Sequence, residues 1–543
     1  MLIAENALSN NSYDQDLARL VHSLMGATSV TQLSQIKVFH AKYPNEAHAN
    51  YLLADAMAAN GQELMAIPFA QKAVHTGKFH PDYAALLITI YTQFFFLEQI
   101  DQLLPLVLAT GKSSAAQDQA IGNYFSKLGR PESAVPYLKR AYATHVEPIA
   151  KRGAIGLVVT CLRDSGQNDE ARALLQELLA GEDTRAEALS DLAQIARSDD
   201  VPAIEEQIES LLEEKDADVS LTPQRLEILH LQLGNLKEKK GQHDAAFENW
   251  RTSRSFVNRT YNAIATERGI KDTKAFYKPD LFDRTAPYAS LDASLVFVMG
   301  MPRSGTTLTA QILSAHPDGA SAGELARLAA EANVFMSRYH VAGGVKQLLL
   351  DAESGEIAAR TDEFIKLAKL VAGKPAAKIV DKTPTQFLSA GYIHLIFPNA
   401  KFINVERHPA DVFISTYQNN FQRSFEFAFD QKDFAHFFLQ RHEILKHWRR
   451  LFPDNILDVS YEALTRNPEE QVRRILDFLE LDWDPACLKF FERSSTVRTF
   501  SRDQVRSAIN TKSVARWRNY EKHLSPLFES LEKAGYSYTE TVV

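Results

Sequence analysis

Two residue groups in the second half of the chain have the types and spacing that anion binding requires. The first is Met301-Pro-Arg-Ser-Gly-Thr-Thr, which follows the apolar run Ser294–Gly300 and precedes a segment with helical apolar spacing. Strand, glycine-bounded loop and helix is the layout in which backbone amides and a helix N-terminus bind an anion. Gly300 and Gly305 have the spacing of a nucleotide-binding P-loop, but Thr306 stands where that motif requires lysine. The sequence therefore predicts an anion site that is not built for a nucleoside triphosphate.

The second group combines a guanidinium with a hydroxyl. Residues 401–405 read as a strand that runs into Arg407, and a helix is predicted to begin near Pro409. Ser415 follows Arg407 by eight residues, which places its hydroxyl about two turns into that helix. An arginine at a strand end and a serine on the next helix can bind one phosphate from two sides.

These two groups resemble the donor site of sulfotransferases that use 3′-phosphoadenosine-5′-phosphosulfate, PAPS. Pro302–Leu308 is similar to the family's loop for the 5′-phosphosulfate, and the pair Arg407 and Ser415 is similar to its 3′-phosphate site. Further matches to family motifs follow in chain order, at Glu324, Lys382, Tyr461 and Ser501. The segment around Glu324 resembles the one that carries the catalytic glutamate of tyrosylprotein sulfotransferases. The resemblance covers about residues 294–525 and implies an α/β sulfotransferase domain.

The resemblance implies a role for each of these residues. Glu324 is the general base for the acceptor hydroxyl if its segment aligns without a gap, whereas one inserted residue would pair it with the neighbouring acid of the family. Arg303, Lys382 and Ser501 belong on the side of the leaving phosphate. Ser507 stands where the family has lysine, and the adjacent Arg506 could supply that charge. The residues expected to bind PAPS are Arg303, Ser304, Gly305, Thr306, Thr307, Leu308, Arg407, Ser415, Tyr461 and Arg506.

The expected reaction moves a sulfuryl group from PAPS to a hydroxyl and leaves 3′-phosphoadenosine-5′-phosphate, PAP. We expect no metal ion, because arginine and lysine supply the positive charge that such a transfer needs. Cys161 and Cys487 lie far apart and match no zinc or redox spacing. The acceptor stays open: the resemblance favours a protein or peptide tyrosine, but a carbohydrate, a lipid or a small phenol would use the same base and donor loop.

The first half of the chain carries a repeating pattern of glycine and alanine. Glycines at four turns are each followed by alanine five residues later, and two wider gaps are filled by other residues at the same spacing. The pairs are Gly61 and Ala66, Phe95 and Ile100, Gly129 and Ala134, Gly166 and Ala171, Ser198 and Ala203, Gly241 and Ala246. Glycine permits a tight turn, and a small residue lets the next helix pack closely. The pattern resembles tetratricopeptide repeats over about residues 14–258 and predicts six or seven helix pairs; a generic solenoid or bundle is the alternative.

The fold expected from these patterns is multidomain, with three segments. Residues 1–258 form an all-α tetratricopeptide-like solenoid, residues 259–290 a linker, and residues 291–543 a P-loop-like α/β sulfotransferase domain with a mostly parallel sheet. Strands are predicted near residues 295, 378, 401 and 456. The solenoid is expected to bind protein partners or to form homo-oligomers.

Composition and charge narrow the class of protein. The 543 residues are 45% hydrophobic and 24% charged, which excludes a mostly disordered chain. Residues 1–289 hold 29 basic and 37 acidic side chains and so carry the whole net charge of −8, while residues 493–522 hold eight basic and two acidic ones. A local basic cluster in a neutral domain favours a compact anion and argues against nucleic acid. No apolar run reaches transmembrane length and the first residues lack a secretory pattern, so we expect a cytoplasmic protein.

Two further functions are compatible with parts of the sequence. A P-loop kinase of a small molecule would need lysine at position 306 and an acidic magnesium site. A non-enzymatic scaffold, in which the repeats bind a partner, would be expected to have lost Glu324, Lys382 or Arg407, and all three are present.

Overall fold

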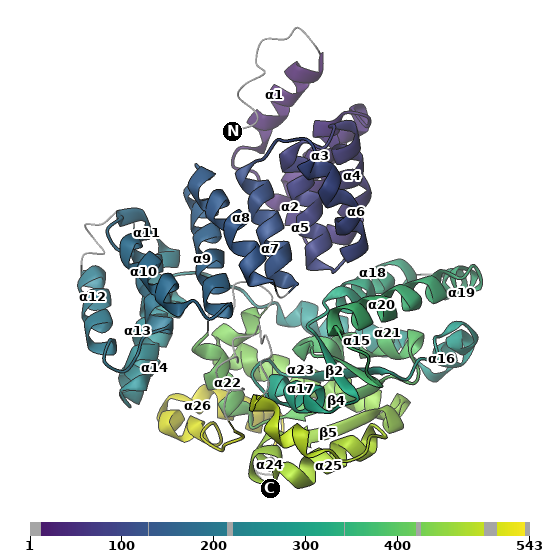
Figure 1. Cartoon of the computed structure of the whole chain (residues 1–543). Helices are drawn as coiled ribbons and strands as arrows, with labels where there is room; N and C mark the ends of the chain where they lie inside the picture. Colours follow the sequence, from purple (N-terminus) through teal and green to yellow (C-terminus); the bar gives the residue numbers. More distant parts are fainter. Residues whose placement is uncertain are drawn as a thin grey trace. The chain divides into compact units, whose positions relative to one another are not determined.

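A computed structural model describes residues 12–128, 130–213, 221–341, 343–419, 425–492 and 508–537. The chain divides into two compact units, Met1–Leu174 and Leu175–Val543 (Figure 1). Within the described ranges, no helix combines the length and the apolar character that crossing a membrane requires.

The first unit consists of helices in succession, most of them joined by short turns. Its helices are α1 (Ser12–Leu24), α2 (Ser29–Lys42), α3 (Ala47–Ala59), α4 (Glu63–Thr76), α5 (Pro81–Gln93), α6 (Leu97–Leu108), α7 (Ala115–Lys127), α8 (Pro131–Thr144), α9 (Pro148–Asp164) and most of α10 (Asn168–Leu178). From α3–α4 onward they form the helix pairs that the glycine and alanine pattern predicts.

The turn residues of these pairs show why the pattern recurs. Gly61 and Gly166 have φ of 73° and 79°, in the left-handed region where a side chain is strained. Phe95, which takes the glycine position in one pair, adopts the same region with φ of 56°. Ala66 and Ala171, five residues after the glycines, are completely buried. The predicted turn and contact positions are thus confirmed at these sites.

The second unit begins with more helices of the same kind. They are α11 (Glu182–Gln194), α12 (Val201–Glu213), α13 (Pro223–Lys239) and α14 (His243–Ser255). The predicted contact at Ala203 is wrong by one residue, because Ala203 is exposed and Ile204 is buried in its place. In the segment expected as a linker lie α15 (Ala263–Phe276), α16 (Pro279–Thr285) and the short 3₁₀ helix η1 (Ala286–Tyr288). The boundaries at residues 258 and 290 stay predictions.

A five-stranded, entirely parallel sheet follows. Its strands are β1 (Leu295–Gly300), β2 (Gly319–Gly323), β3 (Lys378–Asp381), β4 (Lys401–Glu406) and β5 (Ile456–Ser460), in the order β2-β3-β1-β4-β5. The four predicted strands and the parallel sheet are confirmed. The helices around it are α17 (Thr306–Ala315), α18 (Arg327–Tyr339), α19 (Gly344–Glu353), α20 (Glu356–Ala372), α21 (Ala390–Ile396), α22 (Pro409–Tyr417), α23 (Gln431–Leu451), α24 (Tyr461–Arg466), α25 (Pro468–Phe478) and α26 (Ser525–Lys533). The 3₁₀ helices are η2 (Pro384–Leu388), η3 (Glu426–Phe429), η4 (Pro453–Asn455), η5 (Pro485–Glu492) and η7 (Arg516–His523).

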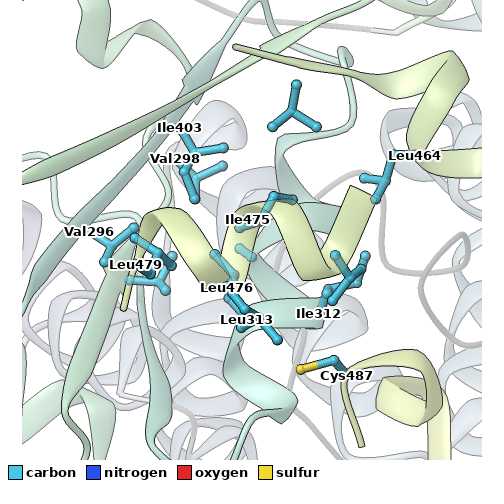
Figure 2. Packing of buried hydrophobic residues seen from close by; sticks show 14 of the residues in the cluster. Val296, Val298, Ile312, Leu313, Ile403, Leu464, Ile475, Leu476, Leu479 and Cys487 are labelled. Atoms are coloured by element: carbon cyan, nitrogen blue, oxygen red, sulfur yellow. The ribbon is translucent and has the colours of Figure 1, made fainter. Parts of the chain in front are cut away.

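Both faces of the sheet are covered by helices, which gives three layers. Val296 and Val298 of β1 pack on one face with residues of α17 and α25, such as Leu313 and Ile475 (Figure 2). On the other face, the ring of Phe297 lies 6.5 Å from that of Phe364 in α20. Alternate residues of a strand point to opposite faces, so a strand buried on both sides reads as one continuous apolar run.

Strand β2 is the element that the sequence does not reveal. Its residues, Gly-Ala-Ser-Ala-Gly, have low strand propensity. They are small because α17 ends against the strand: a Cβ added at Gly319 would lie 2.1 Å from the carbonyl oxygen of Leu313. Close packing therefore overrides local propensity here.

Candidate active site

The carboxyl ends of the five parallel strands lie at one edge of the sheet, and each carries a residue predicted for the site. Glu324 follows β2 and Lys382 follows β3. The glycine loop follows β1, Arg407 follows β4, and Tyr461 follows β5. Ligands of open α/β sheets bind at this edge, so the topology alone gathers residues that are up to 160 positions apart.

The loop between β1 and α17 is shaped by its two glycines. Gly305 has φ of 107°, and a Cβ there would lie 2.4 Å from Cδ2 of Tyr461. A Cβ on Gly300 would lie 2.6 Å from the carbonyl oxygen of Val405. The N-cap residue of α17 is Gly305, which has no side chain to cap the helix. Since the first amides of a helix need an acceptor, this loop and helix end form a favourable place for an anion.

Arg303 lies at the centre of the loop in a strained conformation. Its φ of 69° is unusual for a residue with a side chain, and its Nε donates to Ser415 Oγ at 3.1 Å. Burial, together with the positive charges of Arg407 and Arg516, lowers the pKa of Arg303 to about 10. The side chain stays protonated at neutral pH, and an anion placed here would relieve the repulsion between the guanidiniums.

Arg407 is held from several sides. It is 6% exposed; Nη1 donates to the carbonyl oxygen of Arg303 at 2.8 Å, and Nη2 to that of Ser513 at 2.5 Å. The guanidinium lies 4.6 Å above the ring of Tyr461. In the described ranges, Arg407 Nε and the buried Ser304 Oγ have no hydrogen-bond partner. Two buried donors without an acceptor fit a site that binds phosphate oxygens.

Lys382 and Glu324 form an ion pair at the other end of this edge. Lys382 Nζ donates to Glu324 Oε1; the lysine side chain is 5% exposed and the glutamate side chain 48%. The backbone of Lys382 donates to the carbonyl oxygen of Gly323 at 2.7 Å, which ties the two strand ends together. The glutamate is thus accessible to an acceptor, while the lysine is covered by protein.

Asp381 is a buried carboxyl group that sequence reasoning missed. Its Oδ1 accepts hydrogen bonds from the Leu325 amide at 3.3 Å and from Thr383 Oγ1 at 2.8 Å. Burial is the main cause that raises the pKa of Asp381 to about 7, and the nearby carboxylate of Glu324 adds to it. Because it binds the residue after Glu324 and lies beside Lys382, it holds both in place. The only signal in the sequence is its position at a strand end.

A second missed residue is Asp411 in the first turn of α22. Its two oxygens accept hydrogen bonds from the amides of Ala515 and Trp517, both at 2.8 Å. The Trp517 ring stacks on His408 with the ring centres 5.0 Å apart. Asp411 therefore fastens the segment 511–523 beside Arg407. In the sequence it looks like an ordinary acid at the start of a helix.

The remaining predicted residues divide by what the structure describes. Ser304, Thr306 and Thr307 are buried in the loop and the first turn of α17, and Leu308 is partly buried there. Ser501 and Arg506 lie outside the described residues, so their predicted roles stay predictions. Across the described part of the chain, no three histidine, cysteine, aspartate or glutamate side chains are grouped to bind a metal ion.

Comparisons with known proteins address the family. Residues 295–485 match the family model described as the sulfotransferase family. An uncharacterized protein of Aquifex aeolicus is 32% identical over 71% of this chain, which spans about half (51%) of that relative. A Caenorhabditis briggsae protein described as a candidate protein-tyrosine sulfotransferase is 30% identical, over 41% of this chain and 80% of that protein. The solved sulfotransferase domain of the Synechococcus olefin synthase aligns with 45% of this chain and 94% of its own length, at 20% identity and a TM-score of 0.30.

Proposed function

Since this chain belongs to the sulfotransferase family, we propose that it transfers a sulfuryl group from PAPS to the hydroxyl of an acceptor, most specifically a tyrosine in a protein or peptide. One observation carries the proposal: two groups of residues meet at the same edge of the sheet, on adjacent strands. One group contains the buried donors Ser304 Oγ and Arg407 Nε, which suit a phosphate, and the other is the Lys382–Glu324 ion pair. PAPS carries phosphates at both ends of its ribose. Arg303 and Arg407, which follow the adjacent strands β1 and β4, supply two guanidiniums for such a nucleotide.

The donor supplies an activated sulfate whose leaving group is the 5′-phosphate of PAP. Arg303 and the amides at the start of α17 would bind that phosphate, and Arg407 with Ser415 would bind the 3′-phosphate. Lys382 would neutralise negative charge that develops on the leaving oxygen. Transfer of a largely preformed group depends on alignment and charge stabilisation more than on covalent chemistry, so a site of positioned cations is sufficient.

Glu324 would accept the proton of the attacking hydroxyl. Its side chain is half exposed at the strand end, where an acceptor hydroxyl can reach it, and its ion pair with Lys382 fixes its position beside the donor site. When the donor binds, Lys382 gains a second acceptor in the leaving phosphate, and the glutamate becomes available to the acceptor hydroxyl.

The tyrosine acceptor rests on the relatives, whose names describe proteins that act on protein tyrosines. We propose that a tyrosine peptide is sulfated and that the same peptide with phenylalanine is not. Recruitment of the acceptor by the helix pairs, metal independence and cytoplasmic location stay predictions of the same proposal.

The test uses the full chain with radiolabelled PAPS and a mixture of tyrosine peptides, in the presence of a chelator. Label on tyrosine, with release of PAP, supports the proposal. Thermal unfolding with PAP, compared with ATP and Mg²⁺, checks the donor independently of the acceptor. Stabilisation by ATP and Mg²⁺ alone would favour a kinase, and stabilisation by neither nucleotide would favour a scaffold.

A further inference from the structure

Helix α22, which carries Ser415, ends against the last helix pair of the repeat region. Arg254 of α14 donates from Nη2 to the carbonyl oxygens of Tyr417 and Asn419, the latter at 2.9 Å. Asn235 of α13 donates to the carbonyl oxygen of Gln418 at 3.4 Å. The last carbonyls of a helix have no partner within the helix, and a cation there is favourable. The pair α13–α14 thus supplies the C-terminal cap of α22.

The capping arginine is itself fixed in place. Glu227 of α13, only 2% exposed at its side chain, forms ion pairs with both Arg254 and Arg259. The guanidinium of Arg254 lies 4.5 Å from the ring centre of Phe429 and 5.4 Å from that of Tyr417. A buried guanidinium that is held by an ion pair and two aromatic rings can hold the helix end in place.

A second contact joins the same helix pair to the segment 511–523. Glu238 of α13 pairs with Arg516 Nη2 at 3.1 Å and accepts from Tyr520 Oη at 2.9 Å. The ring of the buried Tyr520 lies 5.4 Å from that of Trp250 in α14. Arg516 also donates to the side chain of Gln418, directly after α22.

That segment reaches the phosphate site from its other end. The carbonyl of Ser513 accepts from Arg407, and the amides of Ala515 and Trp517 donate to Asp411. One short stretch of chain therefore touches the 3′-phosphate arginine at one end and α13 at the other. Helix α22 is likewise held at both ends, by Asp411 contacts at its start and by Arg254 at its finish.

We propose that the helix pair α13–α14 is a positioning element of the donor site, in which Arg254 and Glu238 hold α22 and the segment 511–523 so that Arg407 and Ser415 face the nucleotide. This inference rests on the proposed donor site. Arg254 and Glu238 contact no reacting atom and act through these two elements. The pair α13–α14, which the sequence pattern assigns to the solenoid, is then required for nucleotide affinity. A truncated protein that begins after residue 258 would lack this pair.

The test is made in the full chain with Arg254→Ala, Arg254→Lys and Glu238→Gln. Glu238→Gln can still accept from Tyr520 but loses the ion pair with Arg516. Arg140→Ala in α8 is the matched control, because it removes an arginine of the first unit that pairs with a mostly buried acid, Asp118. The measurements are the Kd for PAP by calorimetry, the KM for PAPS and for the acceptor, and unfolding by tryptophan fluorescence. All four tryptophans lie in the second unit.

We expect the Kd for PAP and the KM for PAPS to rise about 5- to 50-fold in Arg254→Ala and by less in Arg254→Lys and Glu238→Gln. The KM for the acceptor, and kcat at saturating PAPS, should stay within about twofold of wild type. A role in folding alone would lower the amount of active protein and leave both KM values unchanged, and that result would overturn the inference.

Two readouts keep the inference separate from the proposed function. If Arg254→Ala fails to fold, Glu238→Gln decides, and an unchanged Kd for PAP in that variant overturns the inference. If the wild-type chain binds no PAP, the proposed function and the inference fail together. If wild type and every variant bind PAP with equal affinity, the proposed role of α13–α14 fails and the proposed function stands.

Discussion

The ammonium of Lys382 is bonded to the carboxylate of Glu324 across the ends of two adjacent parallel strands, with the lysine buried and the glutamate half exposed. Parallel neighbours place consecutive strand ends side by side, so residues 58 positions apart in the chain meet without any local sequence relationship. The pair has the asymmetry that the proposed reaction needs. A cation is kept under the protein surface where the donor phosphate would lie, and a base is left open to the acceptor.

Glu324→Gln is expected to lower kcat by about 10²- to 10⁴-fold, because the amide cannot accept the acceptor's proton. The Kd for PAP should change far less than kcat, since the glutamate reaches the predicted nucleotide site only through its ion pair with Lys382. Single-turnover transfer and PAP titration measure the two quantities. Glu363→Gln is the matched control, because Glu363 is also half exposed and also pairs with a buried cation, Arg327. Equal activities of the two variants would remove Glu324 from the mechanism.

Arg407→Ala is expected to weaken PAP binding by about 10- to 100-fold, since it removes a charged donor to the 3′-phosphate. Arg407→Lys should recover only part of this loss, because lysine lacks the planar fork that also binds the carbonyls of Arg303 and Ser513. The comparison with 5′-AMP is decisive. This ligand has no 3′-phosphate, so it should bind wild type and Arg407→Ala with similar affinity. A similar loss for PAP and 5′-AMP would place the 3′-phosphate elsewhere.

The sequence predicts the parts of this site that are locally encoded. A strand, a glycine turn and a helix are adjacent in the chain, and so are a strand, Arg407 and α22. Each of these two local motifs can be recognised in a window of about 20 residues. The order of the strands, by contrast, is not visible in any window, and it is the order that brings Glu324 beside Lys382.

What the sequence could not predict depends on packing between distant segments. Strand β2 consists of small residues because α17 lies against it, not because they favour strands. Asp411 has the appearance of a first-turn helix acid, yet it binds amides more than 100 residues away. The solenoid pattern predicts α13 and α14 as a helix pair but contains no sign that Arg254 caps α22.

Gly305→Ala is expected to abolish measurable PAP binding or weaken it by more than tenfold. The added methyl group would strain a residue with φ of 107° and would collide with the Tyr461 ring, which in turn supports Arg407. Calorimetry with PAP measures the loss. Gly61→Ala is the control for backbone strain elsewhere in the chain, because Gly61 also has a positive φ, an added Cβ there meets nothing within 4 Å, and PAP binding should be unchanged. Unimpaired PAP binding in Gly305→Ala would show that the loop tolerates a different shape from the one seen here.

The buried carboxyl group of Asp381 is expected to make the stability of the second unit depend on pH. Its folded-state pKa of about 7 lies above the ordinary value of 3.8, so the folded protein holds a proton that the unfolded chain releases between these values. The contribution of Asp381 to stability is therefore complete below about pH 4 and is lost as pH rises through 7. One pKa unit corresponds to about 1.4 kcal/mol, which sets the upper limit of this loss at about 4 kcal/mol.

Asp381→Asn isolates this contribution, because asparagine keeps an oxygen that can accept from the Leu325 amide and Thr383 but does not titrate. Unfolding should be followed by tryptophan fluorescence, which reports on the second unit alone. The stability of the variant relative to wild type should increase steadily from pH 5 to pH 7.5, where the carboxylate of the wild type is ionised in a buried site. A difference between the two proteins that does not change over this range would mean that Asp381 is ionised throughout, with its charge balanced by Lys382.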